Sequence, residues 1–424
     1  MKNIVLILLL GTLVFPATAQ IQFFQGTLEE AFKKAEAEKK DVFVDFWAGW
    51  CGPCRLMAEK IFPQPGVGEY FNSHFVCIQL NLEEKENQPL GKQYGVKALP
   101  AMLFLSADGK EIHRLEGIAS PEGLIHEARI ARREIMSFSQ IYDRYKQNKK
   151  DLELQQRLLL EAPVFMDRQQ GMERQKWQNR IDGIFSDYLK NKKLKHMIDT
   201  TDFMLLTLYH PSTSKEDAVF DFVAANFDEY AHVVGRDEVA QYLIAMNNGY
   251  IIELCKKGDK AYRERLGRVD GDLKEAYAGF SFGQLSVLDA ITLLADATYA
   301  LYRHELQAFF ENMDKYFVGK GEQADLNDYT QPLEDMAMAY AGKIPPLGFE
   351  KSIPWIGKAL EKNPDPELRT RLLIMLGQCL ENTGEEEKAK QSYNQAFLES
   401  AQIPDPMAMS RLQQTIRGLL NKQN

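Results

Sequence analysis

The chain has 424 residues, a length that exceeds one compact core and predicts two or three domains. Hydrophobic residues make up 45% of it and charged residues 26%, which is the composition of an ordinary globular protein. The formal net charge is −9 and no cluster of lysines and arginines interleaves with aromatic residues, so we expect neither nucleic acid nor an anionic membrane surface as a partner.

Residues 1–19 have the pattern of a secretory signal peptide. Lys2 precedes an apolar stretch over residues 4–15, and small residues follow at positions 17–19. The apolar stretch is shorter than the roughly 20 residues that span a bilayer, which favours a cleaved signal over a retained membrane anchor. We therefore expect cleavage near Ala19 and a mature protein that is periplasmic or secreted.

The next region, residues 20–137, alternates helical and strand patterns. A Thr27-x-x-Glu30 capping box opens the first helix, and the continuous apolar run over residues 42–47 predicts a strand that is covered on both faces. Later strands are expected at residues 75–82, 102–105 and 111–115, and later helices at residues 53–61 and 121–135. One more helix is expected between the second and third strands. This order predicts an α/β domain, a small mixed sheet with helices on both faces.

From residue 138 onwards the strand pattern disappears and helical patterns follow. Apolar residues recur at three- and four-residue steps between Val239 and Leu254, and residues 285–310 form another long helical stretch. The highly charged segment Asp143–Asp151 fits either a linker or an exposed helix. We expect an all-α domain over residues 138–330 and a separate helical region over residues 331–424.

Two segments near the C-terminus share one pattern of small and apolar residues. Ser352, Ile356, Ala359 and Pro364 recur as Ala389, Tyr393, Ala396 and Ala401. This spacing resembles a tetratricopeptide repeat (TPR) hairpin, in which small residues let paired helices approach closely. A generic helical hairpin fits the same pattern.

The residues that carry chemistry are Cys51 and Cys54, which directly follow the predicted buried strand and begin a helix. The N-terminus of a helix favours a thiolate over a thiol, so Cys51 is a candidate nucleophile. Cys54 lies one helical turn away and can resolve a mixed disulfide by attacking the sulfur of Cys51. Pro53 is compatible with the first turn, which needs no amide donor there.

A metal half-site is the usual alternative for a Cys-x-x-Cys pair. Zinc needs four ligands, but Cys77, Cys255 and Cys379 are far apart in sequence and the seven histidines form no pair at helical spacing. We therefore predict no metal, and no motif indicates any other cofactor. A purely structural bridge across so short a loop would stabilise little. We expect Cys77 to be buried and inert. A disulfide between Cys255 and Cys379 is compatible with the sequence and stays an alternative.

Asp45 interrupts the apolar strand before the cysteine pair. A buried carboxylate is costly to ionise, so its pKa should be raised, which makes it a candidate proton relay for Cys54. A solvated or hydrogen-bonded residue at a sheet edge is the alternative. Pro100 opens the third strand, which is an ordinary place for a proline.

These residues give the region 21–137 a resemblance to the thioredoxin family. The resemblance rests on the segments VDFWAGWCGPCR (residues 44–55) and VKALP (residues 96–100), together with Gly109 and Gly117. It implies a thioredoxin fold in which Cys51 attacks, Cys54 resolves, Asp45 is the buried acid and Pro100 is a cis-proline that faces the active site.

The resemblance also implies a substrate-binding surface around the cysteine pair. Leu99 would offer its backbone to an extended substrate segment, Trp50 would flank the cysteines and Gly117 would leave room for substrate. Gly52 and Pro53, between the two cysteines, are the residues that reducing members of the family carry.

The region departs from a cytosolic thioredoxin at three places. The segments Lys60–Gly68 and Glu83–Gln88 look more like exported thioredoxin-like domains that accept electrons from membrane reductases. Gln79 stands where a thioredoxin has a lysine beside the buried acid, which leaves the proton route through Asp45 open.

The sequence thus predicts an exported thiol–disulfide oxidoreductase with a helical, TPR-like C-terminal part. We expect a reductase that acts on disulfide-containing exported proteins and that a membrane electron donor recharges. Two alternatives are a disulfide oxidase or isomerase, and a redox-active scaffold whose helical domain binds one dedicated peptide or protein partner. The direction of exchange depends on the potential of the dithiol relative to its partners.

Overall fold

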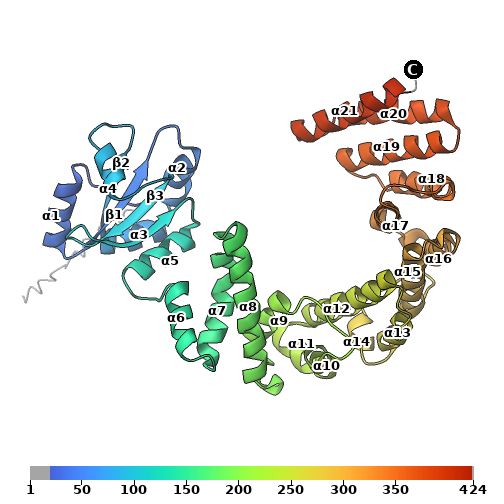
Figure 1. Cartoon of the computed structure of the whole chain (residues 1–424), viewed down its shortest axis with the longest axis horizontal. Coiled ribbons are helices and arrows are strands. Elements are labelled where there is room, and N and C mark those ends of the chain that lie inside the picture. The colour runs from blue at the N-terminus through green and yellow to red at the C-terminus, as the bar shows by residue number, and fades with distance from the viewer. Residues whose placement is uncertain (1–19, 423–424) are drawn as a thin grey trace, which may run out of the picture. The chain divides into compact units, whose positions relative to one another are not determined.

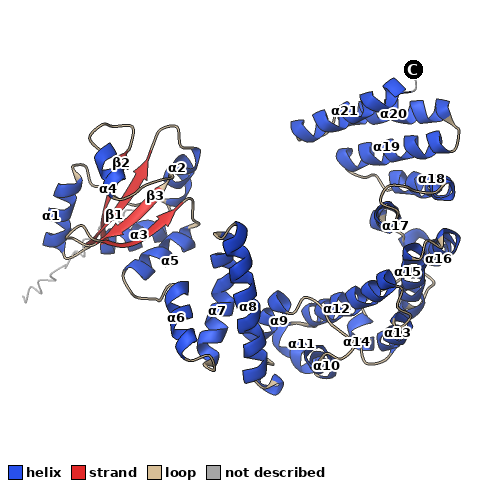
Figure 2. Ribbon diagram, in the orientation of Figure 1, coloured by secondary structure: helices blue, strands red, loops and turns tan. Residues whose placement is uncertain are grey.

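The computed structural model describes residues 20–422, so the predicted signal peptide lies outside the described residues. The chain divides into two compact units, Met1–Ile181 and Asp182–Asn424. The sheet belongs to the first unit, and the second unit is built from helices (Figure 2). None of the helices in the described part of the chain is both long and apolar enough to cross a membrane.

The first unit is organised around a four-stranded sheet, three strands of which are labelled in Figure 1, and the strand order is β2-β1-β3-β4. The strands are β1 (Asp41–Trp47), β2 (Phe75–Asn81), β3 (Ala101–Leu105) and β4 (Glu111–Glu116). β1 pairs parallel with β2 and antiparallel with β3, while β3 pairs antiparallel with β4. The central position of β1 explains its continuous apolar run, because both of its faces are covered.

Helices cover both faces of this sheet, as the sequence predicts. Val42, Val44 and Phe46 of β1 pack on one face beneath α1 and α4, and Phe43 packs on the other face with the remaining helices. The helices are α1 (Leu28–Glu38), α2 (Gly52–Leu56), its π-helical continuation η1 (Met57–Ile61), α3 (Pro65–His74), α4 (Gln88–Gln93) and α5 (Pro121–Ala131). α3 was not predicted, and α5 ends four residues before the expected residue 135 because the chain turns at Arg133, where φ is +61°.

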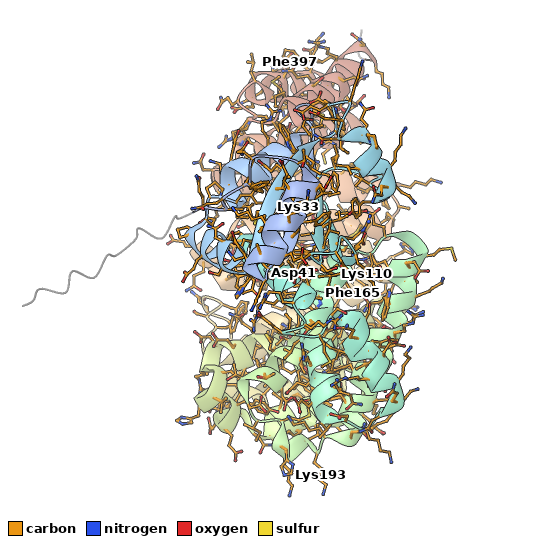
Figure 3. The ribbon with its side chains drawn as sticks, turned by 90° about the vertical axis from the view of Figure 1, so that its left-hand side faces the viewer. Lys33, Asp41, Lys110, Phe165, Lys193 and Phe397 are labelled. Carbon is orange, nitrogen blue, oxygen red and sulfur yellow. A yellow bond between two sulfur atoms is a disulfide. The ribbon has the colours of Figure 1, made fainter. Side chains whose placement is uncertain are left out.

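Two further helices, α6 (Phe138–Gln147) and α7 (Leu152–Asp167), belong to the first unit. The ring of Phe138 stacks on that of Phe165, which is labelled in Figure 3, with centroids 4.1 Å apart. The buried carboxylate of Glu127 on α5 bonds to His113 of β4 and to Arg168 at the end of α7, with 2.5 Å in each case. The stacked rings join α6 to α7, and the bond from Arg168 to Glu127 joins this helical pair to the α/β domain.

The charged segment Asp143–Asp151 is not a linker, and its first half, at the end of α6, is exposed except at Tyr145. Its first residues complete α6, where Tyr145 is 5% exposed. Its last residue, Asp151, is the N-cap of α7 and accepts bonds from the backbone N–H groups of Glu153 and Leu154. The charges therefore lie on the outer face and at the ends of a packed helical pair.

The second unit is a succession of helices. α8 (Gly171–Asn191) contains the division between the units. The helices that follow are η2 (Leu194–His196), α9 (Thr200–Tyr209), α10 (Ala218–Ala225), α11 (Phe227–Val234), α12 (Arg236–Lys257), α13 (Tyr262–Asp270), α14 (Lys274–Tyr277), α15 (Val287–Tyr302), α16 (Leu306–Lys320), η3 (Gly321–Gln323), α17 (Leu326–Ala339), α18 (Pro346–Glu361), α19 (Pro366–Asn382), α20 (Glu386–Ser400) and α21 (Pro406–Lys422). The predicted boundaries at residues 137/138 and 330/331 stay predictions.

The repeated C-terminal pattern falls on the corresponding helices α18 and α20. Ser352, Ile356 and Ala359 of α18 are buried, and so are their counterparts in α20, Ala389, Tyr393 and Ala396. A Cβ atom on Gly377 of α19 would lie 2.3 Å from the Tyr393 ring, so only glycine allows this close approach. Helical hairpins are therefore present where they were expected, and their assignment to the TPR type stays a prediction.

Candidate active site

The cysteine pair lies where the central strand ends and α2 begins. Cys51 is the N-cap of α2, and Cys54 lies in its first turn. The two form a disulfide, with their Cα atoms 5.3 Å apart. The backbone N–H of Cys54 donates a hydrogen bond of 3.1 Å to Sγ of Cys51. Cys51 therefore occupies the end of the helix that stabilises a thiolate once the pair is reduced.

The pair itself is buried, whereas several apolar residues in the segments around it are exposed. Cys51 is 3% exposed and Cys54 is 5% exposed, whereas Trp50 beside them is 72% exposed. Leu56 on α2 and Ile118 in the loop after β4 are also exposed large apolar residues, and neither was singled out from the sequence. Exposed apolar residues beside a reactive group are suited to a protein partner. Gly52 and Pro53, at the exposed start of α2, complete this surface.

A second segment, Leu99–Pro100, lies against the disulfide. The Leu99–Pro100 peptide bond is cis, as the resemblance implied, and the Leu99 side chain packs against the cysteine pair. Neither the N–H nor the carbonyl of Leu99 makes a hydrogen bond within residues 20–422. Its backbone can therefore pair with an added extended segment.

Gly117 follows β4 and donates its N–H to the carbonyl of Pro100 at 2.9 Å. Its φ of +86° is a conformation that other residues rarely adopt, and a Cβ atom there would meet nothing within 4 Å. The positive φ explains why a glycine occupies this position. No other atom of the chain fills the space beside its Cα atom.

Asp45 of β1 is buried on the same sheet face as Phe43, which packs with Met57 just after α2. Its Oδ2 accepts a 2.9 Å hydrogen bond from Nε2 of Gln79, the residue opposite it on β2. Its Oδ1 is buried and has no hydrogen-bond partner among the described residues. Burial raises the pKa of Asp45 to about 6, although the bond from Gln79 acts in the opposite direction. The alternative was a solvated or hydrogen-bonded residue at a sheet edge: the central position of β1 and the burial of Asp45 exclude a solvated edge residue, whereas a hydrogen bond, from Gln79, is present.

Glu83 is a further residue at the site that sequence analysis did not identify as a partner. Its Oε2 accepts a 2.6 Å hydrogen bond from the backbone N–H of Gly49, in the loop that leads to Cys51. The parallel pairing of Trp47 with Asn81 brings the two strand ends together, so the loops that follow them meet. No local pattern could have indicated this contact across 34 positions.

The other three cysteines take no part in the site. Cys77, Cys255 and Cys379 are each buried and unpaired. Burial raises the thiol pKa of all three, to about 12 for Cys255 and for Cys379, so they hold little thiolate near neutral pH. The described residues contain no group of three or more potential ligands that could hold a metal ion. Redox chemistry in this chain is accordingly assigned to Cys51 and Cys54.

Comparisons with known proteins agree with this geometry. The family model described as a thioredoxin-like domain matches residues 28–129. A thioredoxin from Alicyclobacillus acidocaldarius is 35% identical over 109 residues, which cover 25% of this chain and 93% of that protein. A thioredoxin from Chlorobaculum thiosulfatiphilum is 30% identical over 104 residues, which cover 24% of this chain and 90% of that protein.

Solved structures resemble the same share of the chain. A putative disulphide-isomerase from Bacteroides thetaiotaomicron is 37% identical and covers 27% of this chain and 94% of its own, with a TM-score of 0.25. The oxidised C-terminal domain of DsbD from Neisseria meningitidis is 27% identical and covers 25% of this chain and 94% of its own, with a TM-score of 0.23.

Proposed function

This chain belongs to the thioredoxin family and is a thiol–disulfide oxidoreductase, and we propose that it works as a reductase of disulfides in exported proteins. The observation that carries the proposal is the disulfide at the start of α2 beside the unpaired backbone of Leu99. A substrate segment that pairs with Leu99 would bring its own disulfide to the cysteine pair. The Gly52-Pro53 dipeptide supports the reducing direction by resemblance.

The reaction transfers two electrons from the reduced pair to the substrate. The Cys51 thiolate attacks one sulfur of a substrate disulfide, forms a mixed disulfide and releases the other sulfur as a thiolate, which takes a proton from solvent. The Cys54 thiol then loses its proton and attacks Sγ of Cys51. This step forms the Cys51–Cys54 disulfide and releases the second substrate thiol.

Asp45 is the proposed acceptor of the Cys54 proton. Burial, which raises the pKa of Asp45 to about 6, gives the carboxylate a proton affinity suited to exchange near neutral pH. The unpartnered Oδ1 leaves one acceptor position open for that proton, directly or through a water molecule. The oxidised pair is then reduced again by a dithiol donor, which we propose to be a membrane protein.

The redox potential of the pair tests the direction of exchange. We expect a value near the roughly −270 mV of thioredoxin in equilibrium with glutathione or dithiothreitol. A value near the roughly −120 mV of strong periplasmic oxidants would contradict the reductase proposal and assign the protein to disulfide formation. The Cys77→Ala variant, which leaves the pair intact, is the control and should show the same potential.

Export and partner binding complete the proposal. The signal-like residues 1–19 support a periplasmic or secreted protein, and the mass of the mature chain after expression with a secretion system tests this. A chain that begins near Gln20 is expected, and a retained N-terminus would contradict cleavage. The second unit would hold a partner protein for the redox domain.

A further inference from the structure

The second unit contains an open groove that no part of the described chain fills. Its lining residues come from α12, α15, α16 and α17, the helices labelled in Figure 1, and its volume is about 370 Å³. Apolar side chains from three of these helices form its floor, among them Ile251, Leu294 and Phe309. We call this feature the α17 groove, because α17 supplies its polar wall.

The floor of the α17 groove reaches the surface. Ile252 of α12 lines the groove and is 43% exposed. Met338, which lies three residues beyond the groove-lining Asp335 and so on the same face of α17, is 60% exposed. Exposed apolar side chains that continue an apolar groove indicate a surface that a partner covers.

The wall of the groove is acidic. Asp325, Asp328 and Asp335 line it, and the lining residues include no lysine, arginine or histidine. Asp328 is already paired with Lys320, with 2.7 Å between Oδ2 and Nζ. Asp325 and Asp335 have no ion-pair partner in the part of the chain that the structure describes. Asp325 accepts the N–H of Asp328 as the N-cap of α17, and Asp335 accepts a 3.3 Å bond from Gln331. Both carboxylates at the groove thus have neutral donors but no ion-pair partner among the described residues.

The spacing of these carboxylates indicates the size of the occupant. Asp325 is the N-cap of α17 and Asp335 lies ten positions further, so they are about 15 Å apart along the helix axis. A single metal ion or small amine cannot contact both. A helix with basic residues at matching turns can, and an amphipathic helix in an apolar groove is a recurring mode of peptide recognition.

We propose that the α17 groove binds an amphipathic helical segment of a partner protein, whose apolar side chains enter the floor and whose lysines or arginines face α17. The site would recruit a partner for the redox domain, and this role rests on the proposed function. Binding itself needs no disulfide exchange, so it is measured on the full chain with Cys51→Ser and Cys54→Ser. Failure of the docking site and failure of the reductase proposal are thereby distinguished.

The probes are three fluorescently labelled synthetic helical peptides that share the same arrangement of leucines on their apolar face. Their polar faces carry lysine, glutamate or serine, and fluorescence anisotropy at several salt concentrations reports binding. We expect saturable binding of one lysine peptide per chain that weakens as salt rises, and much weaker binding of the other two. The lysine peptide should protect α12 and α17 from hydrogen exchange.

Two substitutions test the floor and the wall separately. Ile252→Gln should weaken the lysine peptide about tenfold, because it removes apolar contact at the groove mouth. Asp335→Asn should weaken it about fivefold, because it removes an unpaired rim charge. The matched controls are Leu398→Gln, at a site that is 73% exposed on α20, and Asp314→Asn, at an exposed position on α16 outside the groove. Circular dichroism confirms that each variant is folded.

Three outcomes would overturn the proposal. Equal affinity for the lysine and serine peptides would assign the groove to an uncharged apolar ligand. Losses of affinity that are the same in the controls would show general attraction to an acidic protein. Absence of binding, with no protection of α12 or α17, would remove the site altogether.

Discussion

Buried carboxylates have different hydrogen-bond and ion-pair partners in the two units of this molecule. Three buried or half-buried aspartates of the second unit each accept a hydrogen bond from a tyrosine hydroxyl and form an ion pair: Asp202 with Tyr188 and Lys192, Asp296 with Tyr262 and Arg263, and Asp328 with Tyr316 and Lys320. Asp45 of the first unit has a single amide partner, Gln79, and an Oδ1 atom with no partner among the described residues.

This difference separates structural from reactive acids. A carboxylate with a hydroxyl donor and a cation has its oxygens engaged and joins the helices that carry its partners. Burial still raises the pKa of Asp202, against the opposing bonds from Lys192 and Tyr188. A buried carboxylate with one neutral partner costs stability when it ionises, and its proton is available for exchange. The contrast therefore assigns chemistry to Asp45 and structure to Asp202, and substitutions in both units test it.

The largest effect is expected at the cysteine pair. Cys51→Ser should lower the rate of disulfide exchange by at least about three orders of magnitude, because the nucleophile is lost. Cys54→Ser should instead accumulate a mixed disulfide through Cys51, which non-reducing electrophoresis detects. The Cys379→Ala variant is the control in the second unit. Substantial activity in Cys51→Ser would show that another thiol carries the reaction.

The next effect concerns the second unit. Asp202 is 0% exposed and Lys192 is 17% exposed in its side chain, so Asp202→Ala leaves a largely buried cation with only a longer ion pair, to Asp199 at 3.7 Å. We expect a loss of about 3 kcal/mol in the stability of the helices around α9, because one half of a buried pair is removed. Hydrogen exchange of α8 and α9 measures it, and the redox potential should not change. If the α8 and α9 amides exchanged at the same rate in Asp202→Ala as in the wild type, Asp202 would have no structural role.

The opposite sign is expected for Asp45→Asn. Burial raises the pKa of Asp45 from its ordinary 3.8 to about 6, so the native state binds more protons than the unfolded state between these values. Wild-type stability is therefore lost as pH rises through this window, and the variant should be more stable by about 3 kcal/mol above it. Below about pH 4 the two proteins should match, because both then carry a neutral side chain.

Hydrogen exchange of the β1 and β3 amides, measured on both sides of this pH window, gives the free energy of opening. Release of a trapped mixed disulfide should be slower in Asp45→Asn, because Cys54 loses its proton acceptor. A variant that is less stable at neutral pH, or that resolves mixed disulfides at the wild-type rate, would remove Asp45 from the proposed mechanism.

The smallest effect is expected at Glu83. Glu83→Gln keeps an oxygen that can accept the bond from the N–H of Gly49, but it removes the negative charge of the carboxylate. Gly49 lies two residues before Cys51, so this charge is close to the cysteine pair. The Cys51 thiolate should be stabilised slightly, which shifts the potential by about 20 mV in the oxidising direction. Glu86→Gln, an exposed change in the same loop, is the control. A shift that is equal in both variants would show that only net charge matters.

The predictable part of the site lies within short stretches of sequence. Cys51, Cys54 and the helix between them are neighbours along the chain, so spacing and helix polarity were sufficient to propose their chemistry. The burial of Asp45 followed from its place in an apolar run, and the structure confirms it. The small residues of α18 and α20 were recognised because a helix repeats its faces at short intervals.

The remaining contacts depend on residues that are far apart in sequence. Gln79 was noticed as a departure, but its bond to Asp45 follows from the register of β1 with β2. Glu83 reaches Gly49 only because the same pairing joins two loops. The α17 groove combines α12 with the three consecutive α-helices α15, α16 and α17, and none of them alone has a pattern that predicts a groove.

The sequence by itself thus determined the reactive pair, the α/β character of residues 20–137 and the helical character of the chain beyond residue 138, because each depends on local periodicity and helix-end electrostatics. Tertiary structure alone decided which partners Asp45 and Gly49 obtain, that α6 and α7 pack with the first unit, and where the second unit leaves apolar surface uncovered. These outcomes depend on which distant segments meet, and strand register and helix packing set that only after the chain has folded.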